Sequence, residues 1–132
     1  MSKSLIVQKY GGTSVGTLER IEHVADRITK TRKTGTDIVV VVSAMAGETD
    51  KLLKMACRLS KNPARREIDL LLSSGERISA ALLTIALQAR GIPALSMTGR
   101  QIGLQTDSTH TRARIKNIDA QRARKMLKEN HV

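Results

Sequence analysis

Aromatic residues are almost missing from this sequence. Tyr10 is the only one among 132 residues, and there is no Phe and no Trp. Modules that bind single-stranded nucleic acid stack the bases on exposed aromatic side chains, so this scarcity argues against that class. Cysteine is equally scarce, because Cys57 stands alone. A single cysteine excludes an intramolecular disulfide and a multi-cysteine metal site.

Membrane and metal-binding patterns are missing as well. No apolar run approaches the ~20 residues of a membrane span, and the first residues do not form the basic and apolar pattern of a signal peptide. We therefore expect a cytoplasmic chain without a membrane contact. His23, His110 and His131 lie far apart with no partner at ligand spacing, so we expect no metal site.

Positive charge, in contrast, is abundant. The chain has 23 Lys and Arg against 12 Asp and Glu, a formal net charge of +11. The segment from Arg100 to Val132 is especially basic. Such a surface attracts nucleotides, nucleic acids or acidic membranes and does not by itself decide among them. The length suits one domain, and the 40% of hydrophobic residues argues against disorder.

Strand and helix patterns alternate along the chain. Residues 38–42 form an unbroken β-branched run, which is typical of a strand covered on both faces. The fold class that this alternation predicts is α/β with a mainly parallel sheet. We expect Cys57, Met55, Met97 and Met126 to lie inside. The other expected elements are strands starting at Leu5 and covering 94–97 and 113–115, and helices over 49–59 and 66–89. We also expect a helix that begins at Leu18 with Thr17 as cap and stops at Gly35, a loop over 98–110, and a last helix capped by Asp119.

The loop after the first strand combines a lysine with paired glycines. In an open parallel sheet, ligands bind beyond the carboxyl ends of the strands. Gly11 and Gly12 would let the backbone approach a phosphate, and Lys9 would add a full charge beside the next helix N-terminus. The spacing matches neither the dinucleotide nor the Walker A pattern. A tight turn beside a solvated lysine is the structural alternative.

Two later segments carry polar groups of the same kind. Ser43 and Thr49 flank the loop after the second strand and could hold a carboxylate or phosphate; otherwise Thr49 caps a helix and Ser43 bonds at the strand end. Gly75 within a helix costs about 1 kcal/mol relative to Ala, which invites a reason such as close ligand approach. Glu76 beside it could hold an ammonium group or simply pair with a surface arginine.

Taken together, the three segments resemble aspartate kinases. Thr98–Gly99, Thr106–Asp107 and 113–115 continue the likeness, which covers essentially the whole chain. The position of Tyr10 usually holds Phe in that family. The stretches that carry the resemblance are 7–16, 40–50, 74–76 and 79–83.

The resemblance implies an amino-acid-kinase fold, a three-layer αβα sandwich, and transfer of a phosphoryl group from ATP with Mg²⁺ to the side-chain carboxylate of L-aspartate. It implies that Lys9 stabilises charge on the transferred group. Gly11, Gly12 and Ser14 would line the phosphate path. It further implies that aspartate is held by Ser43, Thr49 and Glu76, with Glu76 on the ammonium group.

Family members are more than twice as long. The resemblance therefore implies that residues 1–132 are the N-terminal portion of the catalytic domain, without the nucleotide-binding half and the regulatory ACT domains. We expect a fragment that is inactive alone and that self-associates or needs a complementing polypeptide. The alternative is a non-catalytic binding or assembly protein that uses its basic segment, Arg112 to Lys128, to contact an acidic partner or nucleic acid.

Overall fold

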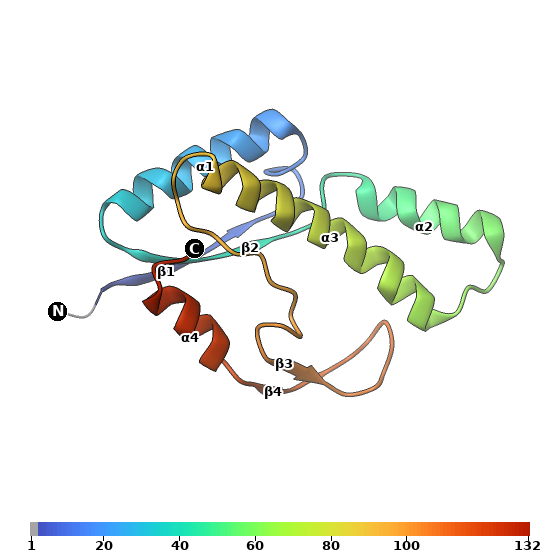
Figure 1. The fold of residues 1–132 in the computed structure, drawn as a ribbon. Coiled ribbons are helices and arrows are strands. Elements are labelled where there is room, and N and C mark those ends of the chain that lie inside the picture. The colour runs from blue at the N-terminus through green and yellow to red at the C-terminus, as the bar shows by residue number, and fades with distance from the viewer. Residues whose placement is uncertain (1–2) are drawn as a thin grey trace.

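The computed structural model describes residues 3–132 (Figure 1). Strands and helices alternate over the first half of the chain, as the sequence predicts. The second half adds a small hairpin and a short helix. The elements are β1 (Leu5–Tyr10), α1 (Leu18–Lys33), β2 (Asp37–Val42), α2 (Glu48–Leu59), α3 (Arg65–Gln88), β3 (Leu104–Thr106), β4 (Ile115–Ile118) and α4 (Gln121–Lys128).

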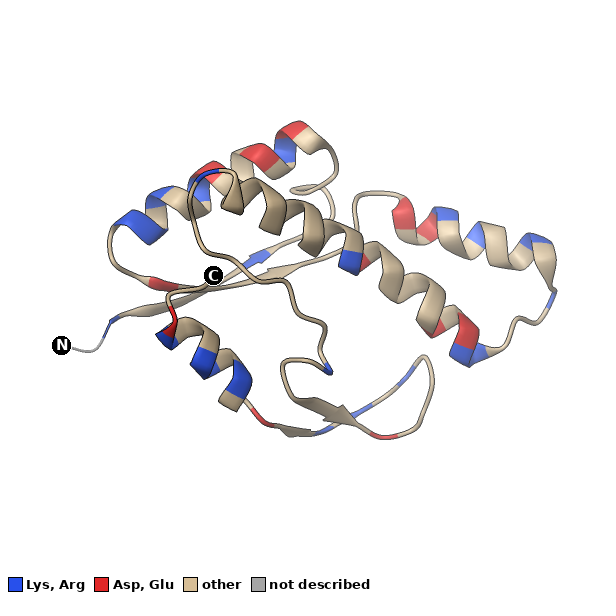
Figure 2. Cartoon of the chain, in the orientation of Figure 1, with Lys and Arg blue, Asp and Glu red and all other residues tan. Residues whose placement is uncertain are grey.

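The parallel pair of β1 and β2 organises the core. Its register places Leu5 opposite Asp37 and Tyr10 opposite Val42. Because successive side chains of a strand point to opposite faces, the even-numbered residues share one face. That face packs against α1 and α3, which lie on the same side of the pair, while the charged residues of the helices lie on their outer surfaces (Figure 2). The buried core residues are Val15, Ile21, Val24, Ala25, Ile28, Ile38, Leu83, Leu87 and Ala94.

Helix α1 begins and ends where the sequence indicates. The side chain of Thr17 accepts a hydrogen bond from the backbone N–H of Arg20 at 3.3 Å, which satisfies a free donor of the first turn. At the other end Gly35 has a φ of +83°, a left-handed conformation that favours glycine, and its N–H bonds to the carbonyl of Arg32. Both predicted ends are confirmed.

The odd-numbered face of the β1–β2 pair is open. Leu5 is 55% exposed, Val7 63% and Val41 44%. We call these three residues the open sheet face. In a parallel sheet both faces are usually covered, so the α/β class is confirmed while the helices of the described residues bury only one face of this pair.

Helix α3 is the longest element and runs without interruption through Gly75. Ser73 and Ser74 bond back to carbonyls of the preceding turn, at 2.9 and 2.6 Å, rather than breaking the helix. By length and composition alone α3 could cross a membrane, which the sequence analysis did not expect. A core helix passes the same test, and α3 packs against α1 and α2.

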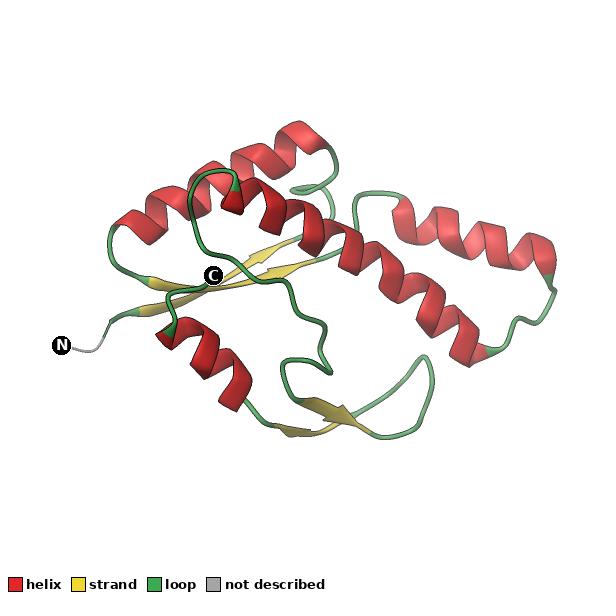
Figure 3. Ribbon diagram, in the orientation of Figure 1, coloured by secondary structure: helices red, strands yellow, loops and turns green. Residues whose placement is uncertain are grey.

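The second half of the chain corrects three expectations (Figure 3). The expected loop over 98–110 contains β3, and the expected strand over 113–115 is displaced to β4, which pairs antiparallel with β3. The displacement follows from Asp107, whose carboxylate accepts the N–H groups of Thr109 and Arg114 and so extends the turn. The expected cap of the last helix is also wrong, because Ala120, not Asp119, holds the capping position of α4, although the Asp119 carboxylate accepts the N–H of Gln121 at 3.1 Å.

The expected strand over 94–97 is not formed. This segment makes two ladder-like bonds with the last residue, since Val132 donates to the carbonyl of Pro93 at 2.9 Å and Leu95 donates to the carbonyl of Val132 at 3.0 Å. That alternation is the pattern of a parallel bridge around Ala94. A single bridge does not make a strand, and Pro93 has no N–H to extend it.

The expected burial of two α2 residues is wrong. Cys57 is exposed, and Met55 is 52% exposed. The helix turns about 100° per residue, so with Leu52 buried against the core, Cys57 lies on the opposite side. Met97 and Met126 are half-buried, as partial filler.

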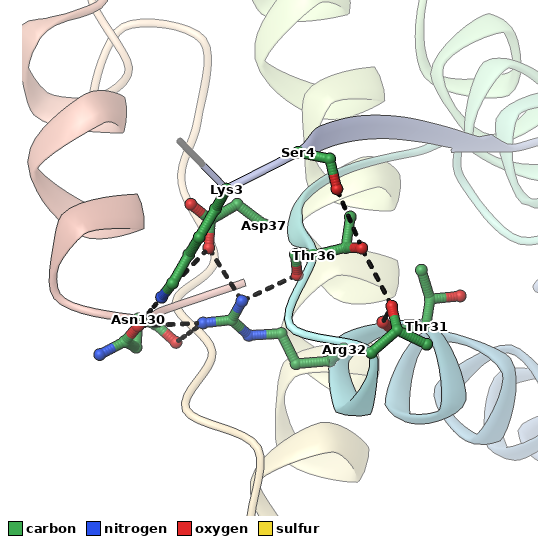
Figure 4. Close-up of polar contacts among 8 residues, drawn as sticks. Lys3, Ser4, Thr31, Arg32, Thr36, Asp37 and Asn130 are labelled. Atoms are coloured by element: carbon green, nitrogen blue, oxygen red, sulfur yellow. Dashed lines mark hydrogen bonds and ion pairs between the residues drawn. The ribbon is translucent and has the colours of Figure 1, made fainter. Parts of the chain in front are cut away.

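A polar cluster ties the two ends of the described chain together (Figure 4). The guanidinium of Arg32 donates to the carboxylate of Asp37 and the carbonyl of Thr36, both at 2.8 Å. It also donates to the backbone and side-chain oxygens of Asn130, at 3.2 and 3.3 Å. Lys3 reaches the same Asn130 side chain at 2.7 Å. Arg32 therefore fastens the end of α4 to the start of β2.

Candidate functional site

The carboxyl ends of β1 and β2 lie side by side, and the loops that follow them are joined by backbone hydrogen bonds. The N–H of Ser43 donates to the carbonyl of Tyr10 at 3.2 Å, which extends the ladder by one step. The N–H of Ala46 donates to the carbonyl of Gly12 at 3.1 Å. Because parallel strands end at the same edge of a sheet, the two polar loops form one surface, as the sequence predicts.

Three glycines let this surface close around two alanines. A Cβ on Gly12 would lie 2.7 Å from the carbonyl oxygen of Ala44, and one on Gly16 would lie 3.3 Å from the Cβ of Ala46. On α3, a Cβ on Gly75 would lie 2.9 Å from the Cβ of Ala44. The reason for a glycine within α3 is therefore contact with the β2–α2 loop, which brings the helix against the strand ends.

Gly11 differs from its neighbour. A Cβ there would meet nothing within 4 Å, so its backbone faces open space. The chain turns tightly just after it, since the N–H of Ser14 donates to the carbonyl of Gly11 at 2.9 Å and Val15 is fully buried. The loop is therefore a tight turn, and the backbone at Gly11 faces open space, while phosphate binding at this loop stays a prediction.

Lys9 lies on the odd-numbered face of β1, opposite Val41 in the register. Alternation continues past the end of β2, so Ser43 follows Val41 on this same face. Lys9 is exposed, and among residues 3–132 its ammonium group makes no hydrogen bond or ion pair. A free cation therefore lies beside the strand ends.

The expected aspartate-binding residues flank this edge on separate elements. Thr49 is exposed in the first turn of α2, and Gly47, not Thr49, holds the capping position, so the alternative of a capping threonine is wrong. Glu76 is exposed directly after Gly75, and within the described chain it pairs with no arginine. The carboxylate that does pair nearby is Glu48, with Lys51 at 3.5 Å.

The structure thus joins some predicted residues and leaves others apart. Gly12 and the loop of Ser43 are linked directly, and Glu76 is brought to that loop through Gly75. Within residues 3–132 no side-chain hydrogen bond or ion pair connects Lys9, Ser43, Thr49 and Glu76 with one another. Sequence analysis missed Ala44 and Ala46, which form the contact point of the three glycines; the alternation of small residues in 43–47 was the available signal.

Metal ligands do not cluster in the part of the chain that is described. Over residues 3–132 there is no group of three or more His, Cys, Asp or Glu side chains that could hold an ion. The three histidines lie on separate elements, and His110 contacts Asp69 at 3.0 Å instead.

Known proteins match this chain over nearly its whole length. The profile of the Amino acid kinase family matches residues 4–132. Aspartate kinase Ask_LysC of Stutzerimonas stutzeri is 55% identical over 129 residues, which cover 98% of this chain and 31% of that protein. The aspartokinase of Geobacillus stearothermophilus is 50% identical over 97% of this chain and 31% of its own length. The chain therefore spans about a third of the curated relatives it matches.

Solved structures agree with the sequence comparison. The aspartate kinase from Synechocystis superposes with a TM-score of 0.85 at 50% identity, over 98% of this chain and 21% of the other. E. coli aspartokinase III in complex with aspartate and ADP superposes with a TM-score of 0.77 at 20% identity, over 98% of this chain and 40% of the other, which shows the shared fold. This chain belongs to the amino acid kinase family, and its residues correspond to the N-terminal part of an aspartate kinase.

Proposed function

We propose that this chain carries the aspartate side of an aspartate kinase, which transfers the γ-phosphoryl group of ATP to the side-chain carboxylate of L-aspartate. The observation that carries the proposal is the joined edge of β1 and β2. There an unpaired lysine, an open glycine backbone and the Ser43 loop meet, with α3 held against them by Gly75.

The proposed chemistry needs positioning and charge more than covalent help. Phosphoryl transfer is catalysed mainly by electrostatic stabilisation of the transferred group. Lys9 would offset its negative charge, and the backbone at Gly11 and Gly12, with Ser14, would line its path. Gly11 is suited to this because its backbone faces open space. Gly12 contributes by fixing the neighbouring loop.

Aspartate would be held by groups from two elements. The Ser43 hydroxyl and Thr49 would bind a carboxylate, and Glu76 would bind the ammonium group by a charge-assisted hydrogen bond. Support comes from the exposure of Thr49 and Glu76 and from the absence of competing partners for Glu76 among the described residues. In one relative of the same fold, aspartokinase III, the solved complex contains aspartate and ADP.

The nucleotide side would come from outside residues 1–132. ATP enters as its Mg²⁺ complex in this proposal, but residues 3–132 offer no carboxylate cluster for the ion. No step performed by this chain passes through the metal. We propose that the isolated chain is inactive and that a polypeptide equivalent to the remainder of its relatives completes the enzyme. A cytoplasmic location and a role in amino-acid biosynthesis, including that of lysine, belong to the same proposal.

Aspartate binding tests the substrate half of the proposal without requiring turnover. Calorimetric titration of the chain with L-aspartate should give a saturable signal that Glu76→Gln weakens at least tenfold. Glu67→Gln is the matched control, because Glu67 is an exposed glutamate on the same helix that pairs only with Arg66. Equal weakening by both variants would contradict the assignment of Glu76.

Complementation tests the catalytic half. Co-expression with a polypeptide equivalent to the remaining two thirds of the Stutzerimonas relative should restore aspartate-dependent ADP formation. Lys9→Met should abolish that activity, whereas Lys33→Met, which removes an exposed lysine at the end of α1, should leave it intact. Turnover by the isolated chain that depends on Lys9 would overturn the proposal that the chain is inactive alone.

A further inference from the structure

A cationic hollow lies on the side of β1 opposite to Lys9. It has a volume of about 220 Å³ and opens between the first turns of α1 and the end of β1. Lys9 and Tyr10 are consecutive on the strand and therefore point to opposite faces. Since Tyr10 lines the hollow, the hollow is separate from the side on which Lys9 lies. Its lining residues are Tyr10, Ser14, Arg20, His23, Val24 and Arg27.

The basic side chains of the hollow share one stripe of α1. Arg20, His23 and Arg27 follow the i, i+3, i+7 spacing that places residues on one helix face. Arg20 is held in place because its guanidinium donates to the backbone carbonyl of Thr13. The side chains of His23 and Arg27 have no hydrogen-bond or ion-pair partner within residues 3–132. These two basic groups thus line the hollow, and no acid is among its lining residues.

Nearby acids do not neutralise this group. Hydrogen bonds at its own backbone and at Thr17 chiefly lower the pKa of Glu19, and the hydrogen bond from Arg90 chiefly lowers that of Asp26; His23 contributes less to both, and neither acid lines the hollow. Asp26 is already engaged by Arg90 at 2.7 Å, and Glu22, the third acid of this helix segment, is exposed and likewise outside the lining.

Two hydroxyl groups line the hollow, and one of them is free to donate. The Tyr10 hydroxyl already donates to the side chain of Gln8 at 2.9 Å, so its hydrogen is engaged within the protein. Burial raises the pKa of Tyr10 and the charge of Arg27 lowers it, so the guanidinium lies within electrostatic reach of the phenol. The Ser14 hydroxyl has no partner among the described residues and can donate.

The geometry points to a binding site for a phosphate group, either free phosphate or a phosphomonoester, between Arg20, His23 and Arg27. Guanidinium groups bind phosphate oxygens through paired, charge-assisted hydrogen bonds. At about 220 Å³ the hollow is smaller than the roughly 300–1,000 Å³ of sites for drug-sized ligands, which suits a phosphate group better than a whole nucleotide. Buried Val24 forms an apolar wall, and among the lining residues only Ser14 also belongs to the phosphate path of the proposed kinase site.

The chain contains a reporter for this site. It has three histidines, and only His23 lines the hollow. Titration with inorganic phosphate at constant ionic strength should shift the His23 imidazole resonances in the NMR spectrum saturably, while those of His110 and His131 stay nearly constant. A parallel titration with glycerol 3-phosphate separates the two sources: tighter binding assigns the site to an ester, and equal or weaker binding assigns it to free phosphate.

Matched variants make the outcome decisive. Arg27→Gln should weaken phosphate binding at least tenfold, and Arg27→Lys should weaken it less, because charge is retained without the paired donors. Lys30→Gln removes the same charge from the same helix outside the hollow and should change binding less than twofold. Equal weakening by Arg27→Gln and Lys30→Gln, or parallel shifts of all three histidines, would overturn the proposal, since they indicate only a general attraction of anions.

Discussion

The two adjacent glycines after β1 should respond in opposite ways to the same substitution. Neither has a positive φ, so alanine fits the backbone at both positions. At Gly12 the added Cβ would meet the Ala44 carbonyl at 2.7 Å, and backbone atoms cannot swing away as a flexible side chain can. At Gly11 the same atom would meet nothing within 4 Å.

The magnitudes follow from overpacking and one hydrogen bond. Overpacking costs about 1–3 kcal/mol, and separation of the loops would also weaken the bond from Ala46 to Gly12, worth about 1 kcal/mol. Gly12→Ala should therefore lower the free energy of unfolding by about 2–4 kcal/mol. Gly11→Ala should leave it unchanged or raise it by up to about 1 kcal/mol, through the lower entropy of the unfolded chain.

Urea unfolding followed by circular dichroism measures both variants. With a slope of about 2 kcal/mol per molar, the midpoint of Gly12→Ala should fall by about 1–2 M while that of Gly11→Ala stays within about 0.5 M. An equal loss of stability in the two variants would refute the reasoning, because it would mean that the whole turn, and not the contact with Ala44, requires glycine.

Three further outcomes are expected. Arg32→Met should lower the free energy of unfolding by about 1–3 kcal/mol, because the Arg32 guanidinium is mostly buried among four acceptors. Lys33→Met should change the free energy of unfolding by less than about 0.5 kcal/mol. Thermal melts in which the two variants lose the same stability would contradict this role of Arg32. Asp26 should titrate below its ordinary pKa of 3.8, chiefly because it accepts a hydrogen bond from Arg90. Its contribution to stability is therefore complete above pH 3.8 and is lost as the pH falls through the lowered pKa of the folded state. A carboxyl NMR titration should show that Arg90→Gln restores the ordinary pKa of Asp26. The chain should self-associate through its uncovered strands, and Val7→Lys on the open sheet face should shift sedimentation toward the monomer; a monomer at every concentration of the unmodified chain would exclude this.

Most of the first half of the fold could be predicted because its signals are local. The β-branched run of 38–42, the cap at Thr17 and the stop at Gly35 each act within a few residues, so their outcomes match the expectation. The second half was harder. The strands β3 and β4 depend on a turn held by the Asp107 side chain, and the segment 94–97 makes its bridge with Val132, a residue distant in the sequence.

The candidate site shows the same division. Its residue types were recognisable because a lysine, paired glycines and a glutamate beside a helical glycine recur at family spacing. The contacts that these residues make in the folded chain could not be predicted. Nothing in the order of residues indicated that Gly12 and Gly75 both accommodate Ala44, or that Arg20, His23 and Arg27 share a hollow with Tyr10 on the other side of the strand.

The sequence by itself determined the strand and helix order, the glycine positions and the kinship with aspartate kinases, because these depend on residue types at short spacing. Only the tertiary structure decided which glycines touch protein and which face solvent. It also decided that Lys9 lies on one side of β1 and that the basic residues of the hollow lie on the other. The physical reason is that close packing joins atoms far apart in the chain, and a contact of 2.7 Å between Gly12 and Ala44 exists only once two loops have met.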